Sequence, residues 1–226
     1  MNYYYQLVRK LTAEFLGTYL LALAVVGSGI MATNLTSDLA LALLINACAT
    51  AAILYLIIHL FKDISGAHFN PLVTLIGASK REISISQALF WIASQISGGV
   101  LGVISANAIF GHSAIEISSK IRTGGNLWLS EIIATAGLIF LIYHFASQAR
   151  EKLIPSGVAL WIFGAYFFTS STAFANPAIT LSRIFTESFA GIAPSSAVKF
   201  IPFQIVGALC GLFLVKVLNP KGDENE

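Results

Sequence analysis

Long apolar segments alternate with short polar connections along almost the whole chain. A helix that crosses a bilayer needs about 20 mostly apolar residues. Six stretches are long enough, and polar or glycine-containing segments separate them. The pattern therefore predicts an all-α membrane protein with six spanning helices, at approximately Leu11–Ala32, Leu39–Phe61, Ile85–Phe110, Leu127–Ser147, Ile154–Phe174 and Ala197–Leu218.

Composition supports the same class and excludes several others. Of the 226 residues, 56% are hydrophobic and only 11% are charged, which is typical of an integral membrane protein and not of a soluble domain. No basic run favours a nucleic-acid partner. No metal-ligand spacing, phosphate-binding loop or nucleophile–base set occurs, so we expect no enzyme, no catalytic residue, no metal and no cofactor.

Two further apolar segments begin with Asn-Pro and are too short to span a bilayer. Asparagine is a good helix N-cap, and proline is favoured at the first helical position. A helix start in lipid would leave backbone N–H groups unsatisfied, so it is tolerated only inside protein or beside a wet cavity. We therefore predict two re-entrant half-helices. After the caps Asn70 and Asn176, they would start at Pro71, Leu72, Pro177 and Ala178.

The two halves of the chain repeat the same order of elements. Each half contains a span with an early glutamate, a second span, an Asn-Pro half-helix and a span with a Gln-Gly pattern. Three crossings per half invert the second copy, so the half-helices should enter from opposite faces and meet near the midplane. We expect one domain, 1–226, with repeats at about 8–110 and 125–218 and a short tail at 219–226.

These motifs resemble the aquaporin and glycerol-facilitator, or major intrinsic protein, family over nearly the whole chain. The resemblance rests on the paired Asn-Pro motifs, on Ser65-Gly66-Ala67-His68 and on Ala13-Glu14-Phe15-Leu16-Gly17-Thr18. It is strongest to divergent bacterial members linked to arsenic handling. It implies an aquaporin-like fold and a passive, energy-independent channel in membrane lipid. It also implies a homotetramer with one pore per subunit.

The family resemblance assigns the pore centre to the two half-helix starts. Asn70 and Asn176 would offer amide donors to a passing oxygen, and the positive helix ends would disfavour cations. Plain helix capping is the alternative explanation for the asparagines, but a matched inverted pair favours a shared role. Pore carbonyls are expected at Gly66, Ala67, His68, Phe174 and Ala175.

The selectivity filter departs from the usual pattern of the family. An arginine normally follows the second Asn-Pro-Ala, and here that position is Ile179. Spacing from the asparagines places the other three filter positions at Thr50, Gly164 and Ala173. Such a small, mostly apolar ring predicts passage of water and of larger uncharged solutes, such as glycerol, arsenous acid or methylated arsenicals. A water-selective aquaporin is the alternative.

Arg183 leaves two interpretations open. It lies four residues after Ile179, on the same helix face and about 6 Å further along the axis. It is either a displaced filter arginine in the outer vestibule or a residue that pairs with Glu187 at i+4.

Two carboxylates inside the spans also have two possible roles. In the family, glutamates placed like Glu14 and Glu131 hold the re-entrant loops through backbone N–H groups. The alternative is the proton relay of a coupled carrier, because carboxylates within a membrane are often functional.

Two pairs of glycines, each with three residues between them, predict where helices pack closely. Gly98 and Gly102, like Gly207 and Gly211, should let the third and sixth spans approach the half-helices closely, although dimerisation is an alternative.

The distribution of positive charge predicts the orientation in the membrane. With both termini inside, nine lysines and arginines would face the cytoplasm and four the outside. The positive-inside rule therefore predicts cytoplasmic termini in a cell (inner) membrane.

Overall fold

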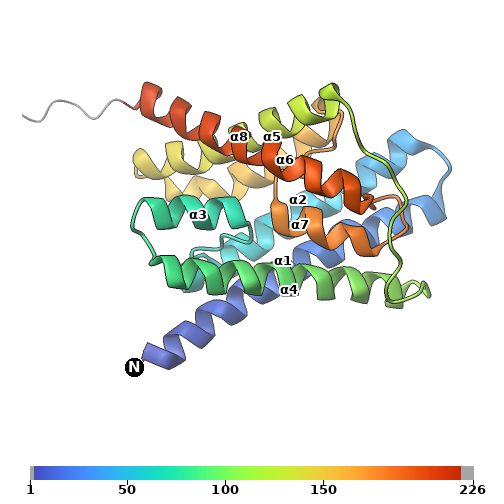
Figure 1. Ribbon diagram of the computed structural model, residues 1–226, viewed down its shortest axis with the longest axis horizontal. Helices are drawn as coiled ribbons and strands as arrows, with labels where there is room; N and C mark the ends of the chain where they lie inside the picture. Colours follow the sequence, from blue (N-terminus) through green and yellow to red (C-terminus); the bar gives the residue numbers. More distant parts are fainter. Residues whose placement is uncertain (1–2, 220–226) are drawn as a thin grey trace, which may run out of the picture.

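Eight α-helices and two short 3₁₀ helices make up the computed structural model, which describes residues 3–219 (Figure 1). Apart from Asn219, the predicted tail lies outside these residues. The helices are α1 (Tyr3–Leu35), α2 (Leu39–Ser65), α3 (Pro71–Ser79), α4 (Ile85–Ile109), α5 (Gly125–Ser147), η1 (Glu151–Leu153), α6 (Ile154–Phe168), α7 (Pro177–Ser182), η2 (Arg183–Phe185) and α8 (Pro194–Leu218).

Five helices, α1, α2, α4, α5 and α8, are long and apolar enough to cross a membrane. The fifth predicted span, α6, has 15 residues and is about 22 Å long, which is shorter than the roughly 30 Å of a hydrocarbon core. It ends at Phe168 and not at Phe174 as predicted. The helix stops because Thr169 is extended and Thr172 and Ala173 have positive φ, so the chain unwinds before it reaches Asn176.

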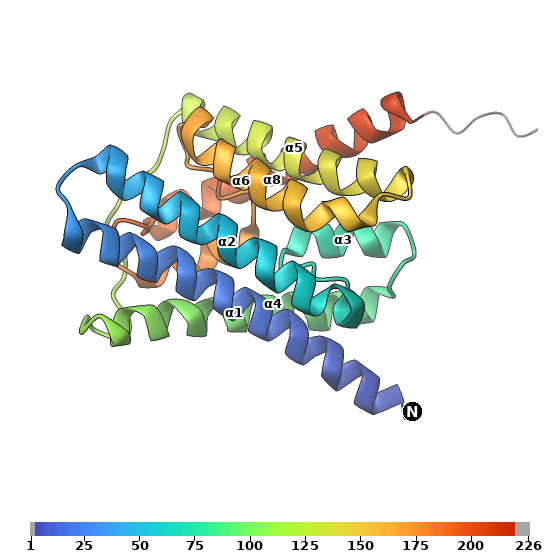
Figure 2. The same cartoon turned by 180° about the vertical axis from the view of Figure 1, so that it is seen from behind.

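The glycine pairs pack spanning helices together. A Cβ at Gly98 or Gly102 would meet the backbone of α1, and a Cβ at Gly207 or Gly211 would meet the backbone of α5. The prediction that these pairs face the half-helices is therefore wrong. The neighbouring Gly99 does face one, because its missing Cβ leaves room for the Ser182 side chain of α7. Close α1–α4 and α5–α8 pairs result (Figures 1 and 2).

The half-helices α3 and α7 lie between the two halves of the molecule (Figure 1). Leu72, Val73 and Ile76 of α3 pack with buried residues of α5 and α8, which belong to the other half. Ile179 of α7 joins a core cluster that includes residues of α1 and α2, again from the other half. Each half-helix thus ties the two repeats together.

Candidate functional site

Asn70 and Asn176 begin the two half-helices with the same geometry. Both have extended backbones, with φ of −150° and −155°. The Asn70 Oδ1 accepts from the Leu72 backbone N–H at 2.9 Å, and the Asn176 Oδ1 accepts from Ala178 at 3.0 Å. Pro71 and Pro177 occupy the first helical positions. The sequence thus places a side-chain oxygen where each helix start needs an acceptor.

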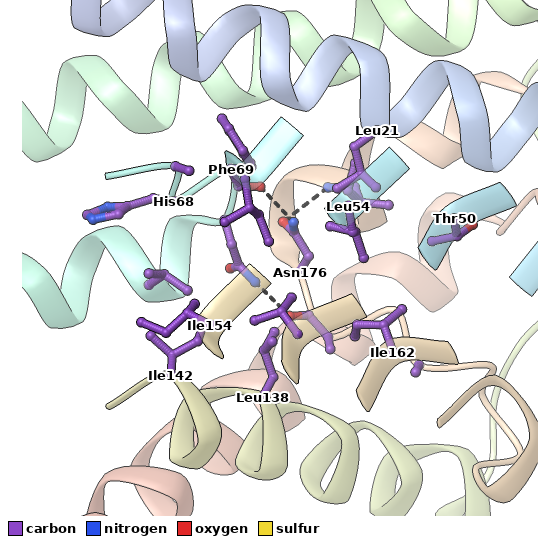
Figure 3. A pocket seen from close by; sticks show the side chains of 18 of the residues that line it. Leu21, Thr50, Leu54, His68, Phe69, Leu138, Ile142, Ile154, Ile162 and Asn176 are labelled. Carbon is purple, nitrogen blue, oxygen red and sulfur yellow. Dashed lines mark hydrogen bonds between the residues drawn. The ribbon is translucent and has the colours of Figure 1, made fainter. Parts of the chain in front are cut away.

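The amide nitrogens of the same asparagines cross between the two halves. The Asn70 Nδ2 donates to the Ala175 carbonyl at 2.8 Å, and the Asn176 Nδ2 donates to the Phe69 carbonyl at 2.8 Å (Figure 3). A carboxamide nitrogen carries two hydrogens. Because both asparagines line the same cavity, the second hydrogen of each is left for a molecule inside it.

Glu14 binds the loop before the first half-helix. Its carboxylate accepts from the Ser65 hydroxyl at 2.6 Å and from the backbone N–H groups of His68 at 3.0 Å and Phe69 at 2.8 Å. The Gln95 side chain donates to it at 2.7 Å. Glu14 is fully buried and is not among the residues that line the cavity.

Glu131 makes the corresponding contacts in the second half. It accepts from the backbone N–H groups of Phe174 at 3.0 Å and Ala175 at 2.9 Å, and from the Gln204 side chain at 2.6 Å. Gln204 also donates to Thr180, as Gln95 does to Thr74. Glu131 too lies away from the cavity wall. Both carboxylates therefore meet donors within the protein and not a passing solute.

The two loops have matching backbone conformations. Ala67 and Phe69 have φ of 54° and 48°, and Ala173 and Ala175 have φ of 51° and 47°. This left-handed region costs a non-glycine residue roughly 1–2 kcal/mol. The bonds to Glu14 and Glu131 fall on these loops, so they offset part of that strain.

A cavity of about 280 Å³ runs past the two asparagines. Its wall is built from rows at i, i+4 spacing on the surrounding helices, which place one residue per turn on the same face. Figure 3 shows Leu21, Leu54, Leu138 and Ile162 around Asn176. The α2 row is Thr50, Leu54, Ile58 and Lys62, and the α6 row is Ile154, Val158, Ile162 and Tyr166.

The end of the cavity that Thr50 and Ile179 line differs from the predicted filter at one position. Thr50, Ala173 and Ile179 line the cavity, but Gly164 does not. Tyr166 lines it instead, because the α6 row continues from Ile162 to Tyr166. The Tyr166 hydroxyl lies 3.1 Å from Thr50 Oγ1. The ring predicted to be small and apolar therefore contains an aromatic residue and a pair of hydroxyl groups.

Arg183 is 4% exposed and lines the cavity, as does Ile179. Its Nε donates to the Ala190 carbonyl at 2.5 Å, and its guanidinium lies 3.6 Å from the centre of the Phe174 ring. No described residue is bonded to its terminal nitrogens.

The alternative pairing of Arg183 with Glu187 does not form among the described residues. Glu187 accepts from the backbone and the hydroxyl of Ser119. The i+4 geometry fails because η2 follows α7 at Arg183 and the chain turns extended at Thr186.

The predicted carbonyl residues Gly66, Ala67, His68, Phe174 and Ala175 all belong to the cavity lining. The Ala175 carbonyl already accepts from Asn70, as noted above. Sequence reasoning missed Phe69, whose carbonyl accepts from Asn176, and Tyr166. The i, i+4 apolar row on the fifth span was the signal for Tyr166. The prediction of Gly164 counted residues back from Asn176, and the count failed because it crossed the unwound segment after α6.

Comparisons with known proteins agree with this architecture. Residues 3–173 match the family described as Major intrinsic protein. The chain is 42% identical to aquaglyceroporin AqpS of Rhizobium meliloti (strain 1021), over 95% of this chain and 91% of that protein. It is 25% identical to Homo sapiens aquaporin-4 over 88% of this chain, and it spans 59% of that longer relative.

A solved structure supports the same fold. The aquaglyceroporin from Plasmodium falciparum superposes with a TM-score of 0.73 at 20% identity, covering 95% of this chain and 98% of that one. The helical, multi-pass architecture and the family match agree. The chain belongs to the major intrinsic protein family, whose members are membrane channels and not enzymes.

Proposed function

We propose that this channel conducts water and larger uncharged solutes, with glycerol as the first candidate and neutral arsenicals as the second. The observation that carries the proposal is the convergence of Asn70 and Asn176 on one cavity, each with one amide hydrogen left over. Two fixed donors among mostly apolar side chains bind a solute oxygen weakly, which allows fast passage.

The outer end of the cavity supports passage of solutes larger than water. Ile179 stands where most relatives carry an arginine, and Ala173 adds little bulk. Arg183 and the Thr50–Tyr166 hydroxyl pair provide hydrogen-bonding groups that a polyol could use. Similarity to two proteins described as aquaglyceroporins points in the same direction. A water-selective channel would be expected to present a narrower outer ring.

Arg183 acts in this proposal as a displaced filter arginine. Its terminal nitrogens have no protein partner among the described residues, although the side chain is almost completely buried against the cavity. A buried guanidinium offers donors to a solute and repels cations. Its removal should widen the outer constriction and weaken that barrier.

Passive flux is favoured over a proton-coupled carrier. A relay carboxylate must reach the transport path, whereas Glu14 and Glu131 lie outside the cavity lining and accept bonds from the loops. Their arrangement supports the family role of holding the two re-entrant loops in place.

Assembly and orientation belong to the same proposal. We infer a homotetramer with one pore per chain, from the family resemblance, and cytoplasmic termini in an inner membrane. Figure 1 shows the N-terminus, the α3–α4 connection and the end of α8 on one side of the molecule. This side carries Arg9 and Lys10 of α1, Lys80 and Arg81 of the α3–α4 connection and Lys216 of α8, so it is the side that the positive-inside rule assigns to the cytoplasm.

Stopped-flow light scattering on proteoliposomes tests the proposed function. Water, glycerol, urea and arsenous acid would be compared with protein-free liposomes. We expect flux of water and glycerol that persists when an ionophore collapses the pH gradient. Water flux without glycerol or arsenous acid flux would contradict the wide-filter proposal, and flux that requires the gradient would indicate a coupled carrier.

The variant Arg183→Ala tests the displaced arginine. Water and glycerol can both bond to the guanidinium, whereas only the larger solute needs the space that its removal leaves in the cavity wall. We therefore expect a clear rise in the glycerol-to-water permeability ratio. Lys199→Ala is a matched control, because Lys199 is an exposed cation of α8. An unchanged ratio in Arg183→Ala would remove Arg183 from the filter.

A further inference from the structure

The outer connection between α4 and α5, residues 110–124, carries a second arginine close to the filter. Arg122 is not part of the cavity lining. Its Nε donates to the Gly191 carbonyl at 2.9 Å, and one terminal nitrogen donates to the Phe189 carbonyl at 3.3 Å. Its own backbone N–H donates to the Ser196 hydroxyl at 3.0 Å. One side chain thus joins two carbonyls of the segment that precedes α8.

The same segment positions Arg183. The Ala190 carbonyl accepts from the Arg183 Nε and lies between the two carbonyls that Arg122 binds. Lys120 also donates to the Phe189 carbonyl, at 2.9 Å. The acceptor that fixes the filter arginine is therefore held on both sides by cations of the outer connection.

A second contact joins the two arginines through an aromatic ring. Arg183 lies 3.6 Å from the centre of the Phe174 ring, and Arg122 lies 5.3 Å from the same centre. Phe200 packs against the Phe174 ring edge-on at 5.3 Å. The face of an aromatic ring attracts a cation electrostatically. Phe174 is thus shared between the filter and the outer connection.

We propose that Arg122 is a positioning residue that sets the selectivity of the channel by holding Arg183 against the cavity wall. The inference rests on the proposed filter role of Arg183. Without Arg122, the 189–191 segment loses two hydrogen bonds to the outer connection, and the Phe174 ring loses one of its two cations. The Ala190 carbonyl then has room to move, and the Arg183 guanidinium can leave the outer constriction.

A double-mutant cycle tests this dependence. The glycerol-to-water permeability ratio would be measured for the wild type, Arg122→Met, Arg183→Ala and the double variant. Methionine retains an apolar stem but removes the charge and the donors. We expect Arg122→Met to shift the ratio in the same direction as Arg183→Ala. We expect the double variant to match Arg183→Ala within about twofold, because a residue that acts through Arg183 has nothing left to position.

A purely structural role for Arg122 would give a different pattern. Damage to the outer connection would multiply with Arg183→Ala or would lower water permeability alone. Arg122→Lys keeps the cation but cannot make both hydrogen bonds of the arginine, so its permeability ratio should fall between those of the wild type and Arg122→Met. If Arg122→Met does not assemble, Arg122→Lys provides the test. Lys199→Met is the control for loss of an outer cation, and its ratio should stay that of the wild type.

Each outcome separates this inference from the function on which it rests. If Arg183→Ala shifts the ratio and the Arg122 variants do not, or if the two effects multiply, the positioning role is wrong and the filter role stands. If Arg183→Ala leaves the ratio unchanged, the filter role fails and the positioning role fails with it.

Discussion

Asn70 and Asn176 each use one carboxamide for three contacts. The oxygen caps the half-helix of the same repeat, one amide hydrogen bonds the opposite loop, and the second hydrogen faces the cavity. An aspartate could supply the cap but would lack the donors and would add a negative charge. A serine could cap but could not also bridge the two loops. This threefold demand is a physical reason for asparagine at both positions.

Tyr166 offers a test at the scale of one atom. Tyr166→Phe removes the hydroxyl that lies 3.1 Å from Thr50 Oγ1 but keeps the ring in place. A hydrogen bond between this hydroxyl and a passing glycerol would be worth about 0.5–1.5 kcal/mol, or roughly two- to tenfold in binding. We expect glycerol permeability to fall by about that factor, with water permeability changed less. Stopped-flow measurements of both solutes check this, and an equal effect on both would contradict a solute contact at Tyr166.

The re-entrant loops are the elements that give the site its shape. Their left-handed residues recur with the same spacing from each asparagine, and each loop is bonded to a buried glutamate of its own repeat. Local propensity does not favour this backbone, so tertiary contacts must impose it. The strained loop backbone and the buried glutamate that bonds to it occur together in both halves.

Glu14→Gln tests the loop-holding contact. A glutamine has one side-chain acceptor oxygen, so its NH₂ would face either the N–H of His68 or both the N–H of Phe69 and the NH₂ of Gln95, where an acceptor is needed. An unmatched buried polar group costs about 1–3 kcal/mol. We expect a lower thermal midpoint in detergent and lower flux. Glu151→Gln is the control, since Glu151 is exposed in η1. Equal stability of the two variants would rule out a holding role.

Gly98→Ala tests the packing of α4 on α1. The added Cβ would meet the backbone carbonyl of Phe15, which cannot rotate away as a side chain could. Overpacking of this kind costs about 1–3 kcal/mol. We expect a reduced thermal midpoint by fluorescence-detected size exclusion. Gly125→Ala serves as the control because nothing lies within 4 Å of its added Cβ. A Gly98→Ala protein as stable as this control would contradict the close approach.

Sequence patterns predicted the elements correctly where each pattern lay within one helix. Hydrophobic runs located the spanning helices, and Asn-Pro located both half-helix starts, because those signals are local. The filter assignment at Gly164 missed Tyr166 because the count crossed the unwound segment after Phe168. Likewise, the Arg183–Glu187 pairing assumed a helix that ends before Glu187. The glycine partners depended on which helices become neighbours, which the spacing alone does not specify.

The whole molecule is held together by exchange between its two repeats. Each half-helix packs against helices of the other half, and Asn70 and Asn176 each donate to the loop of the other half. The cavity therefore exists only when both halves fold together. In the aquaporin-like arrangement the two donors share this cavity with apolar side chains from several helices, some of which Figure 3 shows around Asn176.

Cysteine block of water flux tests most directly whether this cavity is the conduction path. Cys48 and Cys210 are exposed and would first be replaced by serine. In that background, Val158→Cys introduces a thiol into the cavity lining, whereas Leu160→Cys places one on the outward face of the same helix, where Leu160 is 69% exposed. We predict that ethylmercury chloride blocks water flux through Val158→Cys and leaves Leu160→Cys conducting. Unchanged flux through a fully labelled Val158→Cys protein would contradict the account.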